Sequence, residues 1–124
     1  MNARRILFVI ALSLSALALV ACGRPQSLPP RSISVELVEF TITPDAYAAR
    51  VGEPLAFEVS NKGVLEHNLT LVNAERKELS VVTVAPGQTA SFDFTPSAPG
   101  QLQVICTVAG HHKAGMTAQL TIGP

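Results

Sequence analysis

Short runs in which every second residue is apolar recur between residues 32 and 124. The clearest of these runs lie at 33–37, 55–59, 67–71, 102–106 and 116–122. Alternate residues of a strand share one face of a sheet, so each run predicts a strand with one buried face. Turns rich in Gly and Pro separate the runs, and no stretch shows the period of a long amphipathic helix. About eight such strands predict an all-β fold, a Greek-key sandwich or barrel.

The first run changes phase along its length. The apolar residues of 33–37 fall on odd positions, whereas those of 38–42, which include Phe40, fall on even positions. A shift of one residue moves every following side chain to the other face of a sheet. We therefore expect a β-bulge in this region, or a strand that crosses from one sheet to the other.

Residues 106–116 bring together side chains that favour a soft transition metal. They read Cys-Thr-Val-Ala-Gly-His-His-Lys-Ala-Gly-Met, so a thiol, imidazoles and a thioether lie within one short stretch. Magnesium and calcium prefer oxygen ligands, whereas sulfur and imidazole suit copper. Copper that cycles between Cu(I) and Cu(II) is commonly held by two His and one Cys, with a long axial Met. Cys106, one histidine and Met116 would supply three of these ligands, and His67 is the candidate for the second imidazole.

The strand phase supports this grouping independently. Cys106, Met116 and His67 each share the phase of the apolar residues two and four positions away in their runs. All three should therefore point into the interior, while His111 would come from the loop between two strands. Free cysteines are also commonly buried as simple hydrophobes. The convergence of three donors in the buried phase makes a metal site the better explanation.

Residues 32–124 resemble a cupredoxin, the small blue copper domain of the azurin, plastocyanin and auracyanin type. The resemblance rests on His67 with Asn68, Cys106 with Thr107, Gly110 with His111, and Met116. Four residues separate Cys from His and another four separate His from Met, a spacing most like the auracyanin-type loop. The similarity implies a Greek-key sandwich that binds one type 1 copper ion.

Two residues depart from the family pattern. Ala109 stands where many members carry a proline before Gly-His, and this difference is expected to loosen the loop. Glu66 precedes His67 where azurin has a glycine whose carbonyl faces the metal. The second departure argues against a fifth, carbonyl ligand.

The resemblance assigns a role to each donor. Cys106 would bind as thiolate and contribute most of the covalency, His67 and His111 would complete a trigonal plane, and Met116 would cap it weakly. His112 also lies between Cys106 and Met116. We choose His111 because the preceding glycine permits a tight bend and because Gly-His matches the family loop. His112 would then face solvent, as a solvated polar residue or as a modulator of partner contact.

Asn68 and Thr107 are the candidates for supporting residues around the site. By analogy with the family, hydrogen bonds between them would brace the His67 strand against the Cys106 loop. Restraint of this kind tunes both the geometry and the redox potential of a metal site. Ordinary strand polarity is the alternative explanation for both residues.

The N-terminus reads as an export signal. Arg4 and Arg5 precede an apolar run from residue 6 to 21, which is shorter than the roughly 20 residues that comfortably span a bilayer. The run ends in Leu-Val-Ala-Cys22, which resembles the bacterial lipobox, in which the cysteine is lipidated and becomes the first residue of the mature protein. An ordinary signal peptide or an uncleaved anchor are the alternatives. Each alternative puts the domain outside the cytoplasm.

This assignment divides the chain into a signal peptide at 1–21, a lipidated, Pro-rich linker at 22–31 and a cupredoxin domain at 32–124. Extended Pro-rich chain rises about 3.1 Å per residue, so the linker could hold the domain roughly 30 Å from a membrane. Two cysteines in an exported protein would normally suggest a disulfide. If Cys22 bears lipid, Cys106 is the lone thiol.

Charge and ligand number narrow the function. Loss of residues 1–21 leaves seven Lys and Arg against nine Asp and Glu, a net charge of 7 minus 9, or −2, which gives no basis for nucleic-acid binding. A site filled by four protein ligands leaves no open position for a substrate, so we do not expect an enzyme. We expect a membrane-tethered, monomeric one-electron carrier with transient redox partners. A copper-trafficking lipoprotein of the same fold is the alternative, and a metal-free structural sandwich would leave the buried donors unexplained.

Overall fold

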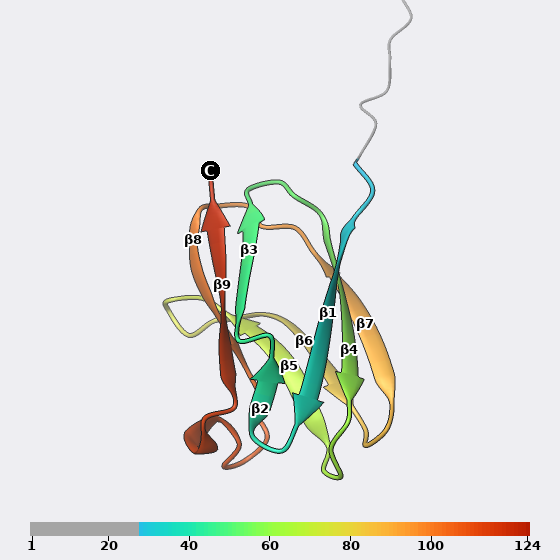
Figure 1. Cartoon of the computed structure of the whole chain (residues 1–124). Coiled ribbons are helices and arrows are strands. Elements are labelled where there is room, and N and C mark those ends of the chain that lie inside the picture. Colours follow the sequence, from blue (N-terminus) through green and yellow to red (C-terminus); the bar gives the residue numbers. More distant parts are fainter. Residues whose placement is uncertain (1–27) are drawn as a thin grey trace, which may run out of the picture.

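The computed structural model describes residues 28–124. The predictions for the signal peptide, for Cys22 and for most of the linker lie outside these residues, and the domain boundary at residue 32 stays a prediction. The described chain forms nine strands in two sheets and one short 3-10 helix, η1 (His112–Ala114) (Figure 1). The predicted all-β sandwich is therefore confirmed, with nine strands in place of about eight. No helix of residues 28–124 is long and apolar enough to cross a membrane.

Each sheet combines parallel and antiparallel neighbours. The four-stranded sheet has the order β2 (Thr41–Thr43), β1 (Arg31–Val38), β4 (Leu55–Asn61), β7 (Thr89–Phe94). The five-stranded sheet has the order β3 (Ala46–Arg50), β9 (Thr117–Gly123), β8 (Gly100–Ile105), β5 (His67–Val72), β6 (Glu78–Val84). The pairs β1–β4 and β3–β9 are parallel, and the remaining pairs are antiparallel. The chain passes between sheets after β2, β3, β4, β6 and β7, so contacts distant in sequence dominate the fold.

The alternating residues meet between the sheets, as their phase predicts. Phe57 on β4 is the largest fully buried side chain, and its ring stacks on Phe92 of β7 at a centroid distance of 4.9 Å. Tyr47 of β3 approaches Phe57 from the other sheet, edge to face, at 6.1 Å. Burial of one such side chain contributes about 1.5–3 kcal/mol. The aromatic contacts therefore tie the two sheets together near the middle of the core.

The expected bulge or sheet crossing after residue 37 is wrong. β1 and β2 form an antiparallel hairpin in the same sheet, with Val38 opposite Thr41, so Glu39 and Phe40 are its two-residue turn. The phase changes because the two-residue turn places odd positions of β1 opposite even positions of β2, as in the pair Leu37 and Ile42. Two-residue hairpin turns usually contain Gly, Asn or Asp, and Glu-Phe offers no such signal. Phe40 instead adopts φ 64°, a conformation uncommon for a bulky residue, and it is 43% exposed.

Four connections gather at one end of the sandwich (Figure 1). They are the β1–β2 turn at 39–40, the β4–β5 connection at 62–66, the β6–β7 connection at 85–88 and the β8–β9 connection at 106–116. The chain enters β1 at the opposite end, where β9 also finishes. All the predicted donors therefore lie at the end of the molecule farthest from the start of β1.

Candidate metal centre

Three of the predicted donors converge in the structure. The Nδ1 atoms of His67 and His111 are 3.1 Å apart, and the Sγ atom of Cys106 lies 3.5 Å from Nδ1 of His111 and 4.0 Å from Nδ1 of His67. These three residues form a buried group whose ligand atoms all lie within 4.8 Å of one another. Residues separated by up to 44 positions in sequence thus present one thiol and two imidazole nitrogens to the same point.

The sheet sets the positions of two of these donors. His67 is the first residue of β5, and Cys106 follows the last residue of β8. The two strands are antiparallel neighbours, with Thr70 opposite Ile105, so the start of one lies beside the end of the other. Both donor side chains fall in the inward phase and both are fully buried. Strand pairing alone therefore brings the thiol to the first imidazole.

The loop between β8 and β9 brings in the second imidazole. Gly110 adopts φ 86°, a left-handed conformation that glycine adopts at little cost. The amide of His111 then donates to the carbonyl of Val108 at 3.0 Å, which closes a tight turn. His111 is 7% exposed, so the residue is almost closed off from solvent. His112 starts η1, is exposed and is outside the donor group.

Met116 ends this loop and is fully buried. Its amide donates to the carbonyl of His111 at 3.1 Å, and its carbonyl accepts from the amide of Cys106 at 3.2 Å. The backbone of Met116 is therefore tied to two of the three converging residues. Its role as a weak axial ligand stays a prediction.

Asn68 and Thr107 are joined by two hydrogen bonds outside the donor group. The Nδ2 group of Asn68 donates to Oγ1 of Thr107 at 2.8 Å, and the amide of Thr107 donates to Oδ1 of Asn68 at 2.8 Å. Thr70 adds a third bond, from its hydroxyl to Oδ1 of Asn68 at 3.2 Å. Each of the first two residues directly follows a donor in the chain. These bonds therefore link the backbone behind His67 to the backbone behind Cys106.

The electrostatics of the site suit a metal. Burial, and next the neighbouring imidazole of His111, lower the pKa of His67, so its ring is neutral at pH 7 with one nitrogen lone pair available. Nδ1 of His67 faces the other donors, whereas Nε2 is buried without any hydrogen-bond partner. Two imidazoles and one thiol, closed off from water, form the soft donor set typical of copper. The residues present fit one type 1 copper ion.

Two residues near the donors were not predicted from the sequence, and both belong to the β1–β2 turn. Phe40 packs edge to face against the ring of His111, with centroids 5.3 Å apart and an interplanar angle of 86°. The Oε1 atom of Glu39 lies 3.6 Å from Nε2 of His67. The phase change at residue 38 is the available signal, but it suggests a bulge or a sheet crossing, whereas the structure has a turn.

The family comparison follows from this geometry. Residues 47–124 match the family described as multicopper oxidase. The chain belongs to the multicopper oxidase family. The chain is also similar to the copper-resistant cuproprotein CopI of Pseudomonas aeruginosa, with 24% sequence identity over an alignment of 151 residues. That match covers 84% of this chain and 83% of CopI.

Solved structures identify the fold of this multicopper oxidase family member more narrowly. Auracyanin from Roseiflexus castenholzii, in a dithionite-reduced form, matches with a TM-score of 0.70 at 17% identity over 75% of this chain and 97% of its own. Auracyanin B gives 0.72 at 20% identity over 78% and 91%. Auracyanin A, described as a "blue" copper protein of Chloroflexus aurantiacus, gives 0.68 at 17% over 77% and 100%. At these identities the likeness establishes the fold, which is that of a cupredoxin.

Proposed function

We propose that this protein is a type 1 copper electron carrier that works outside the cytoplasm. The observation that carries the proposal is the convergence of Nδ1 of His67, Nδ1 of His111 and Sγ of Cys106 in a closed, buried site. Met116, buried beside them, is the proposed weak fourth ligand. Copper bound there would supply a one-electron couple. The printed names of auracyanin A, a "blue" copper protein, and of the cuproprotein CopI support this assignment.

The chain's contribution is to hold the donors still. One-electron transfer is fast when the site rearranges little between oxidation states, so a carrier needs ligands on rigid elements. His67 and Cys106 stand on neighbouring strands, and the hydrogen bonds between Asn68 and Thr107 join the backbone next to each of them. Restraint from outside the ligand set tunes both geometry and potential. We assign these two residues that bracing role.

We propose that electrons enter and leave near His111, which is the most exposed of the four proposed ligands. Phe40, Val64 and Leu65 are exposed by 43%, 80% and 44%. Phe40 belongs to the β1–β2 turn, and the other two belong to the β4–β5 connection at the same end of the sandwich. We define these three side chains as the apolar rim. Transient redox complexes use small interfaces, below about 1,200 Å². A rim of three apolar side chains suits brief docking of a redox protein better than permanent assembly, in agreement with a monomer.

Copper trafficking is the second candidate, and the printed name of CopI favours it. A trafficking protein must release its metal readily, which calls for accessible donors. His67, Cys106 and Met116 are all fully buried, and His111 is 7% exposed. A closed site of this kind favours retention of the metal over exchange. The burial therefore supports electron transfer as the first candidate.

The family description names an oxidase, but the donor arrangement argues against catalysis. Residues 28–124 contain one His-Cys-His group of this kind. If Met116 fills the fourth position, the metal has no open site for a substrate. A binuclear copper centre of the oxidase type would also call for a second cysteine in the 106–116 loop, where Cys106 is the single cysteine. We therefore propose a carrier and not an enzyme.

We further propose that the carrier is tethered to a bacterial membrane. Residues 1–21 would act as the export signal and Cys22 as the lipidated first residue of the mature chain. Lipid anchoring needs more than one acyl chain to be stable, and lipobox cysteines meet that requirement. Cys22→Ala should release the protein from the membrane fraction. Continued sedimentation of that variant with membranes would contradict the lipid anchor.

Absorption spectroscopy of the copper-loaded, oxidised full chain tests the main proposal. We expect one copper per chain and an intense visible charge-transfer band from Cu(II) thiolate. Cys106→Ser removes the sulfur with little change in size and should abolish the band. A colourless copper-loaded protein, or a Cys106→Ser variant that keeps its colour, would overturn the proposal.

A further inference from the structure

The buried ring of His67 has one nitrogen without a partner. Nδ1 faces the converging donors, while Nε2 is buried and makes no hydrogen bond. A buried polar group without a partner costs about 1–3 kcal/mol. A metal at Nδ1 would oblige Nε2 to carry the ring proton, because a neutral imidazole has one N–H. Metal-bound histidines almost always donate that second N–H to a carboxylate, a carbonyl or a water.

Glu39 provides the carboxylate nearest to this nitrogen. Its Oε1 atom lies 3.6 Å from Nε2 of His67, which is longer than a hydrogen bond. The two residues come from different sheets, Glu39 from the β1–β2 turn and His67 from the first position of β5. A small approach of the carboxylate would bring Nε2 within hydrogen-bonding distance.

Backbone amides hold this carboxylate close to His67. The amides of Val64 and Leu65 donate to Oε1 of Glu39 at 2.6 and 3.0 Å. These two bonds, that from Leu65 first, lower the pKa of Glu39, so the group is ionised at neutral pH. Gly63 leaves the space that the carboxylate occupies, because a Cβ there would lie 2.9 Å from Oε2 and closer still to Oε1. The space left by Gly63 and the two amide hydrogen bonds therefore keep the Glu39 carboxylate beside the ring of His67.

We propose that Glu39 is the positioning residue for His67. Its carboxylate accepts a hydrogen bond from Nε2–H, fixes the plane of the ring and supplies a negative charge that favours the oxidised over the reduced state of the site. This inference rests on the proposed function, in which His67 holds copper. Carboxylate partners of this type raise the basicity of a ligating imidazole, and their loss typically changes metal affinity or activity by 10–100-fold.

Glu39→Gln tests the effect of the negative charge separately from the hydrogen bonds to the backbone amides. Glutamine keeps an oxygen that can accept from the amides of Val64 and Leu65, but it has no negative charge. In the copper-loaded full chain we expect the variant to keep its copper and visible band. The reduction equilibrium of the site should shift toward the reduced form by about tenfold. Glu36→Gln is the matched control, because Glu36 is exposed on β1 and loses the same charge without approaching His67.

Gly63→Ala tests the same contact without altering the glutamate. The new methyl group would displace the carboxylate from its place, so the reduction equilibrium should shift in the same direction as in Glu39→Gln. In the double variant the two shifts should be strongly non-additive, because both remove one interaction. Full additivity would mean that the two residues act separately and would overturn the proposal.

Nitrogen-15 NMR of His67 in the metal-free full chain provides a reading that needs no copper. We expect the ring proton on Nε2, with exchange slowed by Glu39 and faster in Glu39→Gln. A reduction equilibrium in Glu39→Gln equal to that of Glu36→Gln, with only lowered thermal stability, would overturn the positioning role and leave Glu39 as a loop clasp. If the wild-type chain lacks the charge-transfer band, the proposed function fails instead, and the NMR exchange rate still decides whether Glu39 contacts His67.

Discussion

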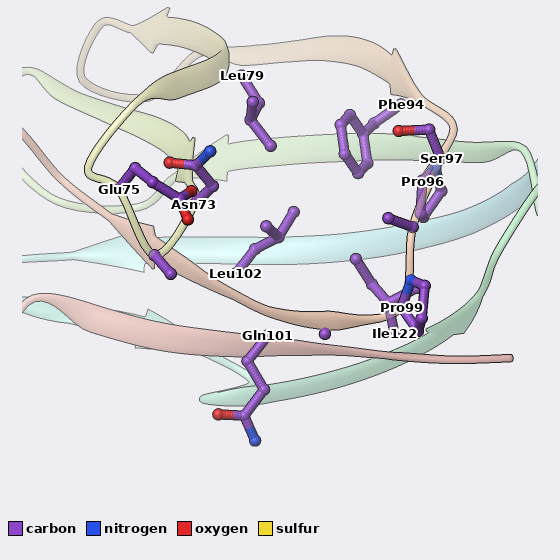
Figure 2. A pocket seen from close by; sticks show the side chains of 13 residues that line it. Asn73, Glu75, Leu79, Phe94, Pro96, Ser97, Pro99, Gln101, Leu102 and Ile122 are labelled. Atoms are coloured by element: carbon purple, nitrogen blue, oxygen red, sulfur yellow. The ribbon is translucent and has the colours of Figure 1, made fainter.

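The two ends of the sandwich differ in what they enclose. At the end where the chain enters β1, a cavity of about 410 Å³ is lined by Leu79, Phe94, Leu102 and Ile122, and residues 96–101 border it as well (Figure 2). At the other end, the ligand atoms of His67, Cys106 and His111 lie within 4.8 Å of one another, and Met116 is fully buried. None of these four donors lines the larger cavity. The difference teaches that convergence of donor atoms, and not the size of a hollow, locates the chemistry of this molecule.

The largest expected effect comes from the donor end and distinguishes two adjacent histidines. His111→Ala should open the site and abolish the normal visible spectrum until external imidazole fills the gap. His112→Ala should leave the spectrum nearly unchanged, because His112 is exposed and outside the donor group. Absorption spectra of both copper-loaded variants, with and without imidazole, provide the measurement. The reverse pattern would move the ligand by one residue.

A change at the cavity end should affect the fold and spare the site. Leu102 is nearly buried and borders the cavity, so Leu102→Ala enlarges a space that already exists. We expect a loss of about 2–3 kcal/mol in the free energy of unfolding, near the lower end of the range for Leu→Ala. Denaturant unfolding measures this loss, and the absorption spectrum is the control. A changed charge-transfer band in this variant would show that the two ends are coupled.

Replacement of the proposed axial ligand Met116 should alter the redox potential of the site and leave copper binding intact. A weak axial thioether tunes potential more than it holds metal, so Met116→Leu should retain both copper and colour. Redox titration should then show a shifted potential, in which each 59 mV or so corresponds to a tenfold change in the one-electron equilibrium. Complete loss of copper would instead make Met116 a principal ligand and would favour the trafficking function.

The smallest effect concerns an ion pair at the entry end. Arg31 and Glu53 are hydrogen-bonded, and this bond, followed by the amide of Arg50, lowers the pKa of Glu53 below its ordinary value of 4.5. A lowered pKa in the folded state means that the stabilisation is present above pH 4.5 and is lost as the pH falls through the lowered value. Thermal midpoints of wild type and Glu53→Gln should differ slightly at neutral pH and converge in acid. A gap that widens in acid would contradict this assignment.

The burial of three of the predicted ligands could be predicted from the sequence because the alternation of inward and outward residues along a strand is a local property. Cys106, Met116 and His67 are all buried, as their two-residue periodicity indicates. The β1–β2 turn could not be predicted in the same way. Glu39 and Phe40 lack the residues that mark a tight turn, and their value lies in contacts with residues far along the chain. Such contacts depend on how the two sheets are packed, which no local pattern encodes.

The opposite placement of the chain entry and the donor loops also sets an orientation. β1 has eight residues, so it rises about 26 Å from the entry end toward the loops. Residue 28, where the described chain begins, therefore lies at the end of the molecule opposite the donor loops. The structure therefore separates the start of the described chain from His111 by the full length of the sandwich.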